Sequence, residues 1–471
     1  MDPKHTFPSE LWLELFAHSS ADTLRNISST NHALHEIARP LGFTEFKLYP
    51  YPYEYQPPQA QLDDAPERLR FWSSPKIAPH VRSCTARYNL SRWQGFTQAD
   101  DGAPHALVNA FFECLPKFTG LQRLYTDRIQ FTQLGLTNLC ALPALTYVDL
   151  SGSKIAAGEQ TDLESLTLRV ATFITRYDQM NALWIPLLSP DSLRELNLSD
   201  ITPLAKPGVQ PFPNVDTLTV NDLPMRSWDT LAILAKFPAV RVFVSDYRGV
   251  LRKMTPAQTS SIFPVLEKYT GTCENLHIFV QRSTLTHITL DTGFPFQRLL
   301  TELQGVTALS NITWLTAQNG NQKLFTLFPR LTELHLTLYP DAEADGGFTP
   351  QATSFLPMLA ASPFLPSTLQ SLSLDWDFPF QYGSTDSAQG NDPAAPAPGD
   401  VPDFSGNSGL RNKLIARCPG LNYIFLDGYH FLFVWWKTSW VWEATAHSYD
   451  DAEVLRAKKT ERKFGPPVLL S

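Results

Sequence analysis

The chain has 471 residues, of which 43% are hydrophobic and 12% aromatic, and its formal net charge is −8. This apolar content excludes a largely disordered chain, and the length exceeds one ordinary core, so we expect several domains or a repeat array. The acidic balance argues against a general nucleic-acid binder, because such proteins usually carry a basic surface.

Three short helices are predicted within residues 7–41. Pro8 suits the first turn of the first helix, and Pro40 is expected to end the third. The first helix carries one apolar stripe, formed by Leu11, Trp12, Leu15 and Phe16. About forty residues make a poor independent core. We therefore expect this segment either to bury its surplus apolar surface against another protein or to cap the domain that follows it.

A frame of the form apolar-x-x-apolar-x-apolar recurs between residues 81 and 430, after a Pro-rich linker at 49–80. Its last two apolar residues, two positions apart, are expected to point from a strand into the core. The middle apolar residues of the copies are Leu124, Val148, Leu166, Leu196, Leu218, Phe243, Ile288, Ile312, Leu334, Leu372 and Ile424. Five of the ten steps between them span 22 to 25 positions, which is the period of leucine-rich repeats. The alternative is a set of separate β-rich domains whose alternation coincides by chance.

Segments of other character lie between and after these frames. Helices are expected at 227–237 and 256–269, each leading into the next strand. The segment at about 383–409 is rich in Gly, Pro, Ser and Ala, which predicts a flexible insertion. Residues 431–471 are expected to form an aromatic cap followed by a basic tail, although the aromatic residues also suit a binding site. Charged residues interrupt the apolar run at 424–442, so we do not expect it to span a membrane.

The residues that support catalysis or metal binding show no recognisable pattern. The five cysteines are scattered without CxxC pairs, which indicates reduced thiols in an intracellular protein. Phosphate-binding loops, zinc-protease motifs and nucleophile elbows are missing from the sequence, as is a signal-peptide pattern. We expect a protein that is not an enzyme, that uses no cofactor or metal, and that binds neither nucleic acid nor membrane. Its expected location is cytoplasmic, nuclear or both.

The N-terminal segment resembles the F-box. The opening pattern of that motif is matched by Phe7, Pro8, Glu10, Leu11 and Leu15, and its remainder by Leu24, Ile27, Leu34, Ile37 and Pro40. Combined with the repeats, the match resembles fungal-type F-box proteins with leucine-rich repeats. The fold implied is α/β: a short all-α F-box of three helices at 1–48, followed by a right-handed leucine-rich-repeat solenoid with irregular repeats.

The resemblance also implies a function and a partner. F-box proteins of this kind are substrate receptors of Skp–cullin–F-box ubiquitin ligases, in which the F-box docks on a Skp-type adaptor and the repeats hold the target protein. The adaptor contacts implied here are Phe7, Pro8, Leu11, Leu15 and Phe16. The family usually has an apolar residue where this chain has Ser19, and such a change costs about 1–3 kcal/mol of burial. The alternative is a stand-alone repeat scaffold in which residues 7–41 are a cap.

The target surface is predicted from strand geometry. Residues that flank the core positions of each frame face outward, onto the concave sheet. The acidic residues at these positions are Asp127, Asp149, Glu195, Asp246, Asp291, Glu333, Asp375 and Asp427. Such a surface would select a basic segment of the target by charge steering. The alternative is that these carboxylates are ordinary solvated ends of strands.

Overall fold

The structure is a computed structural model. The residues that it describes are 9–30, 32–48, 59–87, 106–156, 163, 165–176, 181–206, 208–222, 227–245, 261–276, 278–279, 282–290, 305–315, 325–339, 359–363, 365–376, 408–428, 431–438 and 441–447. The chain divides into two compact units, Met1–Val240 and Arg241–Ser471. Each unit is described on its own below.

The first unit begins with three short helices, α1 (Ser9–Ala17), α2 (Ala21–Ser28) and α3 (His32–Gly42). The hydroxyl of Ser20 accepts a hydrogen bond from the Thr23 amide at 3.2 Å, which caps α2. Phe16 and Ala38, each 2% exposed, lie at the centre of this helical group. The helix α3 continues past Pro40 to Gly42, so the prediction that Pro40 ends it is wrong. Pro40 removes one i→i−4 hydrogen bond, and the helix ends two residues later.

A parallel sheet follows the helices. Its strands, in spatial order, are β1 (Glu45–Leu48), β2 (Ser83–Arg87), β3 (Arg123–Asp127), β5 (Tyr147–Ser151), β7 (Thr172–Ile174), β8 (Glu195–Asp200) and β9 (Thr217–Asp222). One residue of each strand joins a continuous core row, in which every side chain is at most 1% exposed: Phe46, Cys84, Leu124, Val148, Phe173, Leu196 and Leu218. This row contains four predicted middle residues, Leu124, Val148, Leu196 and Leu218, and gives the unit an α/β solenoid architecture with the strand pattern of leucine-rich repeats.

The repeats are joined by a recurring hydrogen-bond pattern just before each strand. The carbonyl of Arg82 accepts from the amides of Gln122 (2.8 Å) and Arg123 (2.9 Å). The Gln122 carbonyl in turn accepts from the amides of Thr146 (2.9 Å) and Tyr147 (3.0 Å). Each backbone carbonyl therefore fixes the start of the next strand, which keeps the strands in register.

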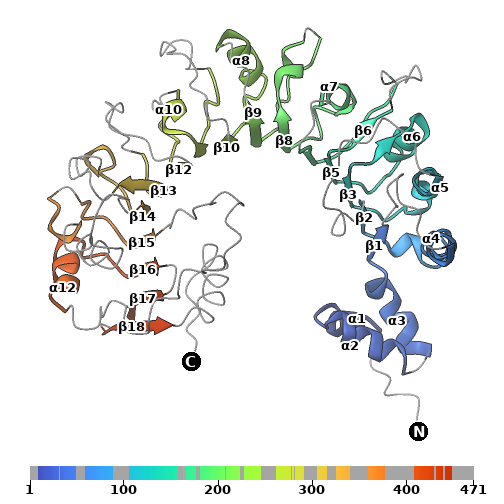
Figure 1. Ribbon diagram of the computed structural model, residues 1–471, viewed down its shortest axis with the longest axis horizontal. Coiled ribbons are helices and arrows are strands. Elements are labelled where there is room, and N and C mark those ends of the chain that lie inside the picture. Colours follow the sequence, from blue (N-terminus) through green and yellow to red (C-terminus); the bar gives the residue numbers. More distant parts are fainter. Residues whose placement is uncertain are drawn as a thin grey trace, which may run out of the picture. The chain divides into compact units, whose positions relative to one another are not determined.

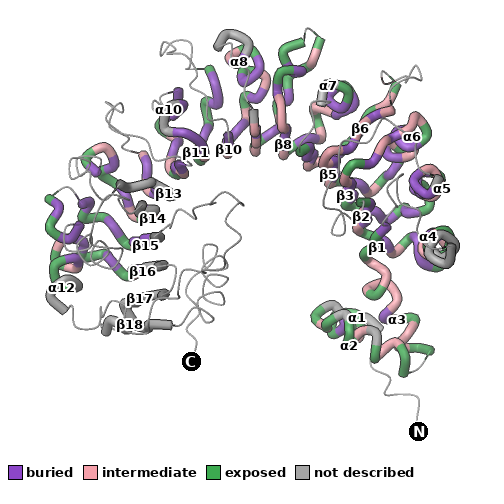
Figure 2. The backbone as a smooth tube through the Cα atoms, in the orientation of Figure 1, coloured by how far each residue is buried: buried purple, intermediate pink, exposed green. Residues whose placement is uncertain are grey.

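Helices cover the outer side of this sheet (Figure 1). They are α4 (Gln59–Trp72), α5 (Ala106–Cys114), α6 (Gln133–Cys140), α7 (Asn181–Trp184) and α8 (Ser227–Leu234), with the short 3-10 helices η2 (Ala78–His80), η4 (Leu115–Lys117), η5 (Ile185–Leu187) and η6 (Thr202–Ala205). A small second sheet pairs β4 (Gln130–Phe131) with β6 (Lys154–Ile155). Buried residues fill the layer between strands and helices, as Figure 2 shows. The core of this unit lies there.

The second unit repeats this plan. Its parallel strands are β10 (Val242–Ser245), β11 (Lys268–Gly271), β12 (His287–Leu290), β13 (Ala308–Leu315), β14 (Glu333–Tyr339), β15 (Ser371–Trp376) and β16 (Tyr423–Gly428). Its outer helices include α10 (Cys273–Leu276) and α12 (Ser408–Arg417). Two antiparallel strands, β17 (Phe431–Thr438) and β18 (Val441–His447), extend the sheet beyond β16. The aromatic segment predicted as a cap therefore continues the sheet.

Three strands lie where the frame did not place them. The predicted strand around Leu166 is wrong, because β7 occupies that place in the sheet with Phe173 in the core row. The helix predicted at 256–269 is also wrong at its end, where β11 places Tyr269 in the core. In β13 the register shifts, so Leu309 aligns with the core row and Ile312 does not.

The sheet also begins before the predicted linker at 49–80. The strand β1 directly follows α3 and pairs with β2, and helix α4 lies inside the predicted linker at 49–80. Most of the predicted insertion at 383–409 lies outside the described residues. None of the helices within the described ranges combines the length and apolar character needed to cross a membrane.

Candidate functional site

The outward positions of the first unit form an ordered array on the inner side of its sheet. In β3 the core residue Leu124 alternates with Arg123, Tyr125 and Asp127. Tyr125 lies opposite Asp149 in the register between β3 and β5, and Arg123 lies opposite Tyr147. The alternation of strand side chains therefore brings residues from neighbouring repeats together on one surface.

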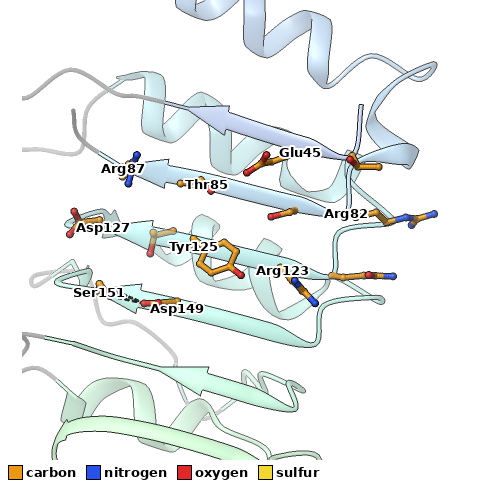
Figure 3. Close-up of a pocket in the computed structure, with 13 residues that line it drawn as sticks. Glu45, Arg82, Thr85, Arg87, Arg123, Tyr125, Asp127, Asp149 and Ser151 are labelled. Atoms are coloured by element: carbon orange, nitrogen blue, oxygen red, sulfur yellow. Dashed lines mark hydrogen bonds between the residues drawn. The ribbon is translucent and has the colours of Figure 1, made fainter. Parts of the chain in front are cut away.

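A hollow of about 730 Å³ lies on this surface over β1, β2, β3 and β5. Tyr125 lies near its middle, as Figure 3 shows. Its charged lining residues are Glu45, Arg82, Arg87, Arg123, Asp127 and Asp149. We call this site the concave hollow.

Each carboxylate of the concave hollow has a cationic neighbour that does not itself line the hollow. The pairs are Glu45 with Lys47 (3.2 Å), Asp127 with Arg128 (3.9 Å) and Asp149 with Arg176 (4.0 Å). Asp149 also accepts hydrogen bonds from the hydroxyl (2.6 Å) and the amide (3.2 Å) of Ser151. Burial raises the pKa of Asp127, while the nearby Arg128 and Arg87 lower it. Each carboxylate therefore has a cation within 4.0 Å, while burial and the nearby Asp149 keep the pKa of Asp127 raised overall.

Two tyrosines form the aromatic part of this surface. The ring centroids of Tyr125 and Tyr147 are 5.0 Å apart, with an angle of 45° between the rings. Burial raises the pKa of Tyr147 to about 12, and the negative charges of Asp149 and Glu195 add to this effect. Tyr147 thus presents a neutral phenol between charged groups at physiological pH.

The structure places the predicted acidic target contacts in different settings. Asp127, Asp149 and Glu195 all lie on the inner side of the first unit, and Asp127 and Asp149 are close enough for their charges to interact. Glu333 is exposed on β14 in the second unit. Asp375 and Asp427 lie opposite each other in the register of β15 and β16. Asp246 and Asp291 lie outside the described residues.

Several basic residues on the inner side of the first unit were missed by the sequence frame. Arg82 and Arg87 flank β2, a strand whose core positions are Val81, Cys84 and Ala86. These residues fit the apolar-x-x-apolar-x-apolar frame once cysteine and alanine are counted as apolar. A frame search with small apolar residues allowed would therefore have placed Arg87 on the outward face, but not Arg82, which precedes the strand.

The N-terminal helices carry a second candidate surface. Leu11, Leu13 and Leu15 of α1 are 48%, 37% and 54% exposed. Phe16 is only 2% exposed and packs against Trp12, with ring centroids 5.4 Å apart. We call Leu11 and Leu15, which are four residues apart on one face, the leucine surface; Leu13 lies on the opposite side of the helix.

The prediction that Phe16 contacts a partner is therefore wrong for this conformation. Leu11 and Leu15 share one face of α1, because they are four residues apart, whereas Trp12 and Phe16 share the adjacent face. The single predicted stripe thus divides into an outer pair and an inner pair. Phe7 and Pro8, the other predicted adaptor contacts, lie outside the described residues.

Ser19, the position that departs from the F-box pattern, ends α1. Its amide donates to the Phe16 carbonyl (3.0 Å), and its hydroxyl donates to the Leu15 carbonyl (3.1 Å). These bonds satisfy backbone carbonyls of the last helical turn, which otherwise lack partners. Ser19 therefore has a structural role at this helix end.

Possible metal ligands are scattered over the described part of the chain. No group of three or more His, Cys, Asp and Glu residues there is placed to hold a metal ion. Cys84 and Cys418 are buried free thiols. Burial raises the pKa of Cys418 to about 11, which keeps this thiol protonated near neutral pH.

Comparisons with known proteins add little to this picture. No protein-family model matches the chain, and no curated protein matches it. A TLR13–ssRNA13 complex aligns over 65% of this chain but only 44% of its own, with 12% identity and a TM-score of 0.39. An internalin (InlF) of Listeria monocytogenes aligns over 75% of this chain and 82% of its own, with 13% identity and a TM-score of 0.30. Neither similarity carries an argument about function at these scores.

Proposed function

We propose that this chain is the substrate-recognition subunit of a Skp–cullin–F-box ubiquitin ligase. The helices α1 to α3 dock on a Skp-type adaptor, and the concave sheet holds the target protein, in the cytoplasm or the nucleus. The chain itself performs no chemical step. Its contribution is to raise the effective concentration of the target near the transfer site.

The leucine surface is the observation that carries this proposal. A short helix that exposes Leu11 and Leu15 on one face gains stability when a partner covers them, by about 1.5–3 kcal/mol for each fully buried side chain. The same helix keeps Trp12 and Phe16 inward, so α1 retains its own small core while the outer face stays available. A helix with one packed face and one exposed apolar face is suited to docking on a partner.

The arrangement of α3 supports the alternative, a stand-alone scaffold in which the three helices are a cap. Phe43, just after α3, packs against Phe71 and Trp72 of α4, with ring centroids 5.8 Å and 5.4 Å apart. These contacts join the helical segment to the first repeat, as a capping element requires. A cap, however, does not need an exposed leucine face on α1.

Co-purification with a Skp-type adaptor tests the proposal. The double variant Leu11→Asp with Leu15→Asp should abolish adaptor binding, because it places two charges in the docking face. The matched control is Leu134→Asp, which changes a leucine of similar exposure (47%) on helix α6. It should bind like the wild type.

Two results would contradict the proposal. Wild-type protein that fails to bind the adaptor at micromolar concentration would favour the stand-alone scaffold. Equal binding by the wild type and the double variant would show that α1 is not the docking element.

A further inference from the structure

Two arginines of the concave hollow, Arg82 and Arg123, make no ion pair with a carboxylate within the described ranges. The third, Arg87, acts on Asp127. Arg82 donates from Nη1 to the Gly120 carbonyl (3.0 Å), which is a neutral group. The Arg123 side chain is exposed. Arg123 is therefore the lining arginine that is available to a carboxylate of a ligand, although the whole chain carries a net charge of −8.

The backbones of these two arginines are hydrogen-bonded, and the side chain of Arg82 is held in place. The Arg123 amide donates to the Arg82 carbonyl (2.9 Å), so both side chains leave the amino ends of neighbouring strands, as Figure 3 shows. The Arg82 guanidinium lies against Gly120, where an added Cβ would come within 2.0 Å of Nη1. An arginine that is already positioned loses less conformational entropy when it binds a carboxylate.

The tyrosine pair supplies the apolar part of the same site. Arg123 lies opposite Tyr147 in the register, and Tyr125 follows it on the same face of β3. Arginine and tyrosine are the residue types that most often dominate binding energy at protein interfaces. A ligand that fits this arrangement carries a carboxylate next to an apolar or aromatic side chain.

We propose that the concave hollow binds an acidic peptide segment of the target protein, with a carboxylate on Arg123 and an adjacent apolar side chain on Tyr125. This inference rests on the proposed function only in assigning target binding to the concave sheet. It reverses, for the first unit, the preference for a basic segment predicted from the sequence. The reversal follows from Arg82 and Arg123, which make no ion pair within the described ranges, and from the cations beside Asp127 and Asp149.

Binding of fluorescent peptides to the full chain tests the inference by anisotropy. The probe is a peptide in which Asp and Glu residues flank a central Phe. Two competitor classes accompany it: the same peptide with Lys at every acidic position, and single-stranded RNA of equal length. We expect the acidic peptide to bind more tightly than both, and its affinity to fall as salt concentration rises.

Charge reversal locates the binding site. Arg123→Glu should weaken binding of the acidic peptide by at least about tenfold. The control Arg68→Glu makes the same charge change at an exposed position on α4 and should leave the affinity unchanged. Because both arginines are exposed, we expect both variants to keep the thermal unfolding temperature of the wild type.

Three outcomes would overturn the inference. They are no binding of the acidic probe up to about 1 mM, equal loss in the two variants, and tighter binding of the Lys peptide or of RNA. Adaptor co-purification by Arg123→Glu separates this inference from the proposed function. If Arg123→Glu still binds the adaptor and keeps the wild-type affinity for the acidic peptide, the acidic-peptide site is rejected and the proposed function is not.

Discussion

At the scale of single residues, exposure divides positions that look alike in the sequence. Leu15 and Phe16 are adjacent apolar residues of one predicted stripe, yet they are 54% and 2% exposed. The sequence pattern gives the apolar side of a short helix to within about one residue, since successive residues differ by about 100° around the axis. Which of two adjacent faces is packed depends on α3, which the local sequence does not contain.

Tyr147 provides a pH test of the inner surface. Its pKa is raised from 10.0 to about 12 in the folded chain. A raised pKa means that the folded state holds the proton more tightly, so this contribution is complete below pH 10 and is lost as the pH rises through about 12. We expect the urea midpoint of the wild type to fall over that range more than the midpoint of Tyr147→Phe. Parallel pH profiles of the two proteins would show that Tyr147 is not in the environment described.

At the scale of elements, the strand pattern was predictable where leucines form the frame. Strands such as β5, β8, β9 and β14 lie where the frame places them. The frame did not predict β7 and β11, because Phe173 and Tyr269 occupy their core positions within segments that lack the frame. Their places in the sheet are determined by pairing with neighbouring strands, which is a long-range interaction.

The turn before β3 provides a test of how neighbouring repeats pack. Gly120→Ala would place a Cβ 2.5 Å from the Pro79 carbonyl oxygen and 2.0 Å from Arg82 Nη1. We expect a loss of about 1–3 kcal/mol in stability, because a backbone atom cannot move away cheaply. The comparison is Gly42→Ala in α3, where the added Cβ meets nothing within 4 Å. Thermal unfolding of both variants measures the difference, and equal melting temperatures would contradict the close packing.

At the scale of the molecule, the chain combines a small helical group with a solenoid. The solenoid architecture could be predicted from the repeat period, because each repeat contributes the same core position. The charge of the candidate target site could not. The frame began at β3, so Arg82 and Arg87 were not counted. The ion pair of Asp149 joins residues of different repeats, whereas Arg128 directly follows Asp127 in the chain.

The two candidate surfaces of the first unit have different chemistry. The leucine surface is apolar and lies on α1, whereas the concave hollow is polar and lies on the sheet. Different chemistry allows two partners to bind without competing for the same residues. The function proposed here requires this separation, since a receptor must hold its adaptor and its target at once.

Hydrogen exchange of the full chain, with and without a Skp-type adaptor, tests the central claim most directly. The account predicts that the adaptor slows amide exchange in α1 (Ser9–Ala17), because the docked helix opens less often, while exchange in β3 and β5 stays unchanged. Unchanged exchange in α1 at saturating adaptor, or protection that falls only on the solenoid strands, would contradict it.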